Sequence, residues 1–396
     1  MRDDVIYLDN GNVTPVAPEV FETMREYYLE RFGVPGGDFG HRLEEEATEA
    51  LIKARETIAR SIGASPEEIV FTSGVTESDN LAIKGVAFSS EKKGKIVTSS
   101  IERKCVLNSA RFLQRFGFTP VYLPVNRVGK VHTGSVERSL DGAILLSVQH
   151  ANQEIGTLQD IRALSELAHD KGVIFHTDAT HSYLREKIDV SKMDIDLLTI
   201  SAHVIHGPLG AGALYVREGI KLEPLIHGDS REFGLRAGHP NVPAIVGFAR
   251  AVELYREEHV EHLRGLQRIL VEELTAIEES RLNGPEVGPH RVPDNVNVSF
   301  RGVEGEAVLM MASERGVILR TGSACFDPAL QASYVIRALG VGVEYANGSV
   351  RLTISRYNTE EEIRKASEVV REVVEKLRGI SPLARKFAGK RVSDAC

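Results

Sequence analysis

Cysteine is scarce in this 396-residue chain, which has only Cys105, Cys325 and Cys396. Three cysteines are too few for a disulfide framework and fit a reducing compartment, so we expect a cytoplasmic location. No run is long and apolar enough to span a membrane, and the acidic start MRDDVIYLDN does not have the pattern of a signal peptide. An excess of basic residues is also missing, because the net charge is −8, so nothing indicates nucleic-acid binding.

Strand-like apolar runs alternate with helix-like stretches between about residues 50 and 255. The runs lie at 69–72, 95–98, 121–123, 143–148, 173–177, 197–201 and 212–216. Such alternation predicts an α/β fold with a mostly parallel sheet that is covered by helices on both faces. Ligands of such sheets bind near the carboxyl ends of the strands.

The pattern changes near residue 256, where a long charged helix is expected over 257–279. Strands at 295–300, 317–320 and 350–354 and helices at 305–315 and 359–377 follow. We therefore predict a large α/β domain over residues 15–255. A smaller α+β domain would contain residues 1–14 and 256–396.

Polar groups that suit an anionic ligand follow several of the expected strands. Residues 73–77, Ser-Gly-Val-Thr-Glu, join a strand to a helix, and the N–H groups at a helix start attract anions. Ser201 and His203 follow another strand. Asp178 ends a third, where a buried carboxylate needs a partner such as a protonated pyridine nitrogen. Taken singly, each has a plainer interpretation as a turn or, for Asp178, as a helix N-cap.

A cysteine and an arginine in the second half of the chain are further candidates. Cys325 lies in Arg-Thr-Gly-Ser-Ala-Cys-Phe, residues 320–326, where small residues leave a thiol accessible. A nearby cation favours the thiolate, although an intracellular thiol is more often a small buried apolar group. Arg351 lies on an expected strand and can bind a carboxylate or form an ordinary surface ion pair.

Many segments of the chain together resemble the cysteine desulfurases of the IscS/NifS type, in class V of the fold-type I aminotransferases. These segments are YLDN (7–10), FTSGVTESDNLAIKG (71–85), HANQEIG (150–156), DAT (178–180), GLRAG (234–238), TGSAC (321–325) and SYVIRALG (333–340). The resemblance implies a PLP-dependent (pyridoxal phosphate) transferase fold with a mostly parallel seven-stranded sheet in the large domain. The smaller α+β domain would carry the cysteine loop at about 320–335.

The resemblance also implies roles for individual residues. Cys325 would attack the sulfur of L-cysteine and carry it as a persulfide, and Arg351 and Asn152 would lie at the substrate. The sulfur acceptor would be a scaffold protein of the IscU type on which iron–sulfur clusters are built, and the protein would be a homodimer. The residues implied at the cofactor are Val75, Thr76, Ser201 and His203 for the phosphate, Asp178 for the pyridine nitrogen and His181 near the ring oxygen.

The chain departs from the family pattern at the cofactor. Val204 stands where the family has the lysine that binds PLP as a Schiff base, and an isopropyl group cannot do this. Arg103 replaces a histidine that stacks on the ring and transfers protons, and an arginine is a poor general base. His239 replaces a threonine that reaches the phosphate of the neighbouring subunit. We therefore expect PLP to bind weakly or not at all.

These observations leave three functions open, of which we favour the first. In a degenerate desulfurase with absent or strongly impaired activity, Cys325 would carry a persulfide or would ligate an iron–sulfur cluster shared with the scaffold partner. The second function is an active desulfurase that converts L-cysteine to L-alanine and an enzyme-bound persulfide with noncovalent PLP. The third is a metal or other cofactor site in the emptied pocket, although plain donors in a polar pocket are the simpler interpretation. The histidines considered for that site are His181, His203, His206, His227 and His239.

Overall fold

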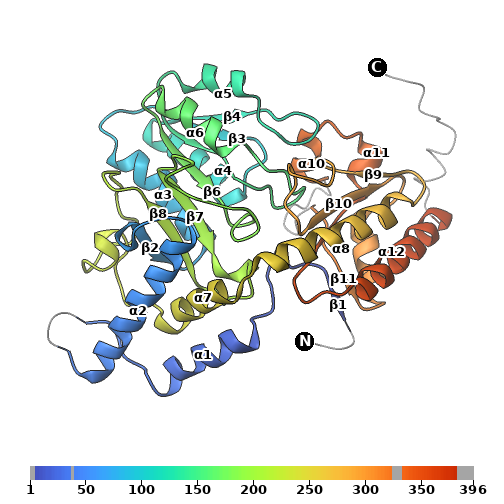
Figure 1. Ribbon diagram of the computed structural model, residues 1–396. Coiled ribbons are helices and arrows are strands. Elements are labelled where there is room, and N and C mark those ends of the chain that lie inside the picture. The colour runs from blue at the N-terminus through green and yellow to red at the C-terminus, as the bar shows by residue number, and fades with distance from the viewer. Residues whose placement is uncertain (1–4, 37–39, 323–331, 381–396) are drawn as a thin grey trace.

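The computed structural model describes residues 5–36, 40–322 and 332–380 (Figure 1). Its strands are β1 (Ile6–Tyr7), β2 (Ile69–Thr72), β3 (Lys95–Ser99), β4 (Thr119–Leu123), β5 (Ala143–Ser147), β6 (Ile174–Asp178), β7 (Leu197–Ser201), β8 (Gly212–Val216), β9 (Ser280–Leu282), β10 (Asn295–Phe300), β11 (Val317–Ile318) and β12 (Ser349–Thr353). Its helices are α1 (Pro18–Leu29), α2 (Arg42–Ser61), α3 (Val75–Ser89), α4 (Lys104–Leu113), α5 (Thr133–Leu140), α6 (Ile161–His169), α7 (Val242–Leu254), α8 (Glu257–Thr275), α9 (Gly305–Ser313), α10 (Tyr334–Ala338), α11 (Val343–Ala346) and α12 (Glu360–Ile380).

A seven-stranded sheet with the order β2-β8-β7-β6-β5-β3-β4 forms the centre of the larger unit. Strand β8 runs antiparallel to both of its neighbours, and the remaining strand pairs are parallel. This arrangement confirms the predicted mostly parallel, seven-stranded sheet. Because β6 and β7 are parallel neighbours, their carboxyl ends bring Asp178 and Ser201 to the same edge of the sheet.

Alternating side chains explain why helices cover both faces of this sheet. In β7, Leu197 packs into the core beneath α3 and α4, whereas Leu198 packs into the core on the opposite face. Val70 and Phe71 divide in the same way in β2. Each such side chain contributes about 1.5–3 kcal/mol when it is fully buried, so the two cores fix the register of every strand.

A second unit contains the antiparallel sheet β12-β10-β9, covered by α8, α9 and α12, and has its own apolar core. Helix α8 leads from the end of α7 to this unit (Figure 1). The N-terminal segment also joins it, because Leu8 packs in its core and accepts a 2.7 Å hydrogen bond from the Thr353 N–H. The domain boundaries at residues 15 and 255 remain a prediction, which the two separate cores support.

Three elements, α8, α9 and β11, end two or more residues earlier than the sequence predicts. Helix α8 ends at Thr275, and β11 ends at Ile318 because Arg320 forms an isolated bridge with Arg351 of β12 instead. None of the helices in the described part of the chain is long and apolar enough to cross a membrane.

Two glycines permit a close approach between the central sheet and the start of α3. Gly212, the first residue of β8, pairs with Thr72 of β2 and with Ser201 of β7. A β-carbon at Gly212 would lie only 2.6 Å from the Cα atom of Gly74. Gly74 precedes α3 and has a φ of 138°, a conformation that favours glycine. The ends of β2 and β7 can therefore lie directly against the first turn of α3.

We expect the substitution Gly212→Ala to destabilise the protein by about 1–3 kcal/mol, because the new methyl group collides with the backbone of Gly74. The matched control is Gly265→Ala in α8, where an added β-carbon meets no atom within 4 Å and alanine favours the helix by roughly 1 kcal/mol. Urea unfolding of both variants measures the two effects. Equal stability changes in the two variants would contradict this account of the close approach.

Candidate functional site

The start of α3 and the end of β7 enclose a small cavity of about 220 Å³. The first N–H groups of a helix have no intrahelical partners and attract anions. Ser201 Oγ lies 2.8 Å from His203 Nδ1, and burial lowers the pKa of His203 to about 4, so its ring is neutral near pH 7. We call this cavity the cradle. The residues that line it are Ser73, Gly74, Val75, Thr76, Glu77, Arg103, Ser201, His203, Leu209 and Gly210.

Val204 follows the cradle residues in a short 3₁₀ turn, Ala202–Val204, directly after β7. Its side chain is 1 % exposed and belongs to the large apolar core. Its carbonyl accepts a 2.7 Å hydrogen bond from Arg185 Nη2, which holds the turn in place. The position therefore offers an apolar group that is firmly packed and has no nitrogen for a covalent bond to a cofactor.

Asp178 is buried at the end of β6, and its carboxylate has two partners within the protein. Oδ1 accepts a 2.9 Å hydrogen bond from the Thr180 N–H, and Oδ2 lies 3.1 Å from Arg103 Nε. Arg103 Nη2 also contacts His181 Nε2. Burial, followed by the charge of Arg103, lowers the pKa of His181 well below its usual value, so this ring is neutral and accepts the N–H.

A second buried acid, Asp79 of α3, was not among the predicted site residues. It accepts a 2.9 Å hydrogen bond from Cys105 Sγ, and His176 Nε2 lies 3.7 Å from its other oxygen. Burial and the neighbouring Asp178 raise the pKa of Asp79 well above its usual value, which favours the protonated acid. The signal was an acidic residue in the mostly apolar buried face of α3.

Cys105 is the free thiol that the structure describes at this site, and it lies at the start of α4. Burial raises the pKa of this thiol above its ordinary value. A protonated, buried thiol is a weak nucleophile. We therefore interpret Cys105 as a hydrogen-bond donor to Asp79 rather than as a nucleophile.

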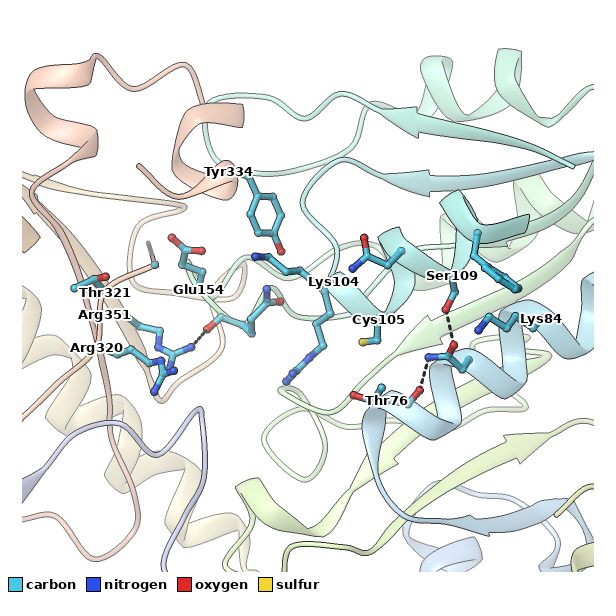
Figure 2. Close-up of a pocket in the computed structure, with 16 residues that line it drawn as sticks. Thr76, Lys84, Lys104, Cys105, Ser109, Glu154, Arg320, Thr321, Tyr334 and Arg351 are labelled. Carbon is cyan, nitrogen blue, oxygen red and sulfur yellow. Dashed lines mark hydrogen bonds between the residues drawn. The ribbon is translucent and has the colours of Figure 1, made fainter. Parts of the chain in front are cut away.

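A larger cavity of about 610 Å³ opens beside the cradle, and Arg103 lines both. In Figure 2, Arg320 and Arg351 from the smaller unit face Cys105 and Thr76 across the cavity. The residues that line it are Thr76, Asn80, Lys84, Arg103, Lys104, Cys105, Asn108, Ser109, Phe112, Gln153, Glu154, Arg320, Thr321, Gly322, Tyr334 and Arg351. Because most of the charged groups in this set are cations, the cavity suits an anionic ligand.

Arg351, a predicted substrate residue, is already bonded within the protein. Its Nη2 lies 2.6 Å from Asp9 Oδ1, and Nη1 donates to the Gln153 carbonyl at 3.1 Å. Arg320 Nη1 lies 3.1 Å from the other oxygen of Asp9. Asp9 thus fixes two guanidinium groups at the cavity wall, where a substrate carboxylate must compete with it.

Asn152, the other predicted substrate residue, has a fully buried side chain that shapes a turn. Its Nδ2 donates to the Ile101 carbonyl at 3.0 Å, and its Oδ1 accepts 2.9 Å hydrogen bonds from the N–H groups of Glu154 and Ile155. Through this turn Asn152 directs Glu154 toward the larger cavity.

Glu154 connects the larger cavity to both flanks of the segment that contains Cys325. Oε2 accepts a 2.7 Å hydrogen bond from Ser333 Oγ, and a β-carbon at Gly322 would meet Oε1 at 1.8 Å. Burial raises the pKa of Glu154 to about 7, although Ser333 and Arg351 oppose the shift. Cys325 itself lies outside the described residues, so its proposed roles as nucleophile, persulfide carrier or cluster ligand stay predictions.

The histidines considered for a metal site do not converge. His206 Nδ1 lies 2.9 Å from the Pro15 carbonyl, and its ring packs edge-on against Tyr357. His227 and His239 are exposed on the surface. Within residues 5–36, 40–322 and 332–380, no three or more His, Cys, Asp or Glu side chains group as metal ligands would.

Comparison with known proteins places this site in a family context. The profile of class-V aminotransferases matches residues 6–365. The cysteine desulfurase IscS of Dictyoglomus turgidum is 42% identical over 388 residues, which cover 96% of this chain and 98% of that protein. The IscS of Methanosarcina thermophila is 44% identical over 390 residues, which cover 97% and 96% of the two chains.

Solved structures of related proteins are also similar to this chain over most of its length. A NifS-like protein superposes with a TM-score of 0.87 at 34% identity, covering 94% of this chain and 100% of that one. A structure of SspA in complex with cysteine superposes with a TM-score of 0.79 at 38% identity, covering 89% and 99%. The fold therefore matches these proteins over nearly its full length.

We expect Glu154→Gln to change how stability depends on pH. The folded pKa of about 7 lies above the usual 4.5, so the native state of the wild type holds a proton that the unfolded state releases first. Wild-type stability should therefore fall, relative to the variant, as pH rises from about 4.5 to about 7, by at most about 3.4 kcal/mol.

Denaturant unfolding at a series of pH values measures this difference, and the exposed Glu137→Gln of α5 is the control. Glutamine preserves an oxygen that can accept the Ser333 hydrogen bond. If the wild type and Glu154→Gln show parallel pH profiles, Glu154 does not titrate in the described way.

Proposed function

Because the chain belongs to the class-V aminotransferase family and matches cysteine desulfurases over nearly its whole length, we propose that it acts in sulfur transfer and iron–sulfur cluster assembly. Membership in this family implies PLP as the cofactor. We propose further that this chain is a degenerate member in which desulfurase activity is absent or strongly impaired. Cys325 then serves as a persulfide carrier, or as a cluster ligand, toward a scaffold partner of the IscU type.

The residues present fit only part of PLP. The cradle offers Ser201, His203 and the start of α3 to a phosphate group, as the family resemblance implies. The pyridine ring of PLP finds no free partner, because the Asp178 carboxylate that would pair with the ring nitrogen is already paired with Arg103. The single observation that carries the proposal is Val204, which is buried, apolar and unable to form a Schiff base.

Sulfur transfer from a loaded cysteine needs no cofactor. The thiolate of an acceptor attacks the outer sulfur of the Cys325 persulfide, and the bond between the two persulfide sulfurs breaks. A new persulfide forms on the acceptor, and Cys325 leaves as a thiolate that takes up a proton. The exchange is redox-neutral, so an external persulfide or polysulfide can load Cys325 by the reverse reaction.

L-Cysteine remains the substrate of the alternative in which PLP binds noncovalently and the protein is active. SspA, which superposes on this chain, is described in complex with cysteine. Arg351 would then bind the carboxylate of the amino acid, in competition with Asp9. The homodimer and the cytoplasmic location also remain predictions.

We expect the purified protein to release no sulfide from L-cysteine in the presence of a reductant, with or without added PLP. The physical reason is that no amine at position 204 can hold the cofactor or exchange it with the substrate. A sulfide assay measures this, and Cys325→Ser provides the background caused by free PLP and cysteine alone. Sulfide release that depends on Cys325 and proceeds at ordinary enzyme rates establishes the active alternative instead.

A transfer assay tests the retained function. The protein is loaded with a polysulfide, washed and mixed with an IscU-type scaffold, and persulfide on the scaffold is measured by mass spectrometry. We expect transfer from the variant Cys105→Ser/Cys396→Ser, in which Cys325 is the remaining cysteine, and none from Cys325→Ser. Equal transfer from Cys325→Ser would contradict the role of this cysteine.

A further inference from the structure

Arg103 lies along the route that connects the cradle to Asp178. It precedes α4, and its side chain lines both the cradle and the larger cavity. From there Nε reaches Asp178 at 3.1 Å, and Nη2 reaches His181. A ring whose phosphate sits in the cradle and whose nitrogen pairs with Asp178 would have to follow this same route.

The charges around Arg103 show that the site is balanced without any ligand. Asp79 favours its protonated form because burial and Asp178 raise its pKa, and His181 and His203 are neutral because burial lowers theirs. Asp178 and Arg103 are therefore the ion pair that remains within this cluster. A second cation placed at Asp178 would lie beside the guanidinium in a poorly hydrated site, which is unfavourable.

We propose that Arg103 is a built-in replacement for the ring cation of the cofactor and sets the ligand specificity of the site. Its guanidinium neutralises the Asp178 carboxylate without any ligand. The protein therefore needs no PLP to balance this charge, and a protonated pyridine is excluded from the position beside Asp178. The cradle stays open to the phosphate end of a ligand, whereas the ring end is closed. This inference deepens the proposed loss of PLP chemistry, because it names the group that closes the site.

Pyridoxamine phosphate is the probe that tests this exclusion. It carries an amine instead of the aldehyde, so it cannot form a Schiff base with Lys84 or Lys104, which also line the larger cavity. We expect weak binding to the wild type and at least tenfold tighter binding to Arg103→His, measured by isothermal titration calorimetry. The matched control is Arg111→His, on the exposed side of α4, which should bind as the wild type does.

Equal affinity of the wild type and Arg103→His for pyridoxamine phosphate would overturn the proposal. This outcome is independent of sulfide release, so the proposed function can fail while this inference holds, and the reverse is also true.

A double-mutant cycle tests the ion pair without any ligand. Arg103→Met should lower the melting temperature, because it leaves the Asp178 carboxylate buried without a cation. Asp178→Asn in the same chain should recover most of this loss, because a neutral amide needs no counter-charge. If Arg103→Met alone does not fold, recovery of folded protein by the second change has the same meaning. Additive effects of the two substitutions, or a double variant that also fails to fold, would show that Arg103 does not serve as the partner of Asp178.

Restoring the missing amine gives a covalent readout at position 204. After incubation with PLP, borohydride reduction and removal of the free cofactor, we expect peptide mass spectrometry to find no adduct at position 204 in Val204→Lys, whereas Val204→Lys/Arg103→His should carry one there. The first substitution supplies the amine, and the second opens the ring position. Equal adduct at position 204 in both variants would contradict the exclusion by Arg103.

Discussion

The ion pair between Arg103 and Asp178 is the interaction on which the rest of this site depends. An ionised carboxylate buried at the end of a central strand costs several kcal/mol unless a cation compensates it. In this chain the cation comes from the protein, at 3.1 Å. Burial, followed by the charge of Asp178, raises the pKa of Asp79, and burial, followed by the charge of Arg103, lowers the pKa of His181. Both members of the pair therefore act on the protonation of their buried neighbours.

Short apolar runs in the sequence were enough to predict the central sheet. They gave the strand positions to within about two residues, because a strand whose two faces are both buried under helices is apolar along its whole length. The shortened β11 was missed, since a strand end depends on which neighbour is available. Arg320 pairs with Arg351 across the structure, and no local pattern indicates that choice.

At the site, the sequence identified the loops and the need of Asp178 for a partner, but not the partner itself. Arg103 precedes α4, far from Asp178 along the chain, so their contact exists only in the tertiary structure. The same holds for Arg351, whose pairing with Asp9 depends on how the N-terminal segment joins the smaller unit. A sequence pattern shows which groups can bind a ligand, whereas the folded structure shows which of them are already bonded.

The flanks of the Cys325 segment are attached independently of the cradle. The described flanks of the Cys325 segment are held by Glu154, which bonds Ser333 and closely approaches Gly322, and by the Glu102 carbonyl, which accepts a 2.6 Å hydrogen bond from Tyr334 Oη. None of these contacts involves the cradle or position 204. A substitution at position 204 therefore leaves these attachments of the cysteine segment in place.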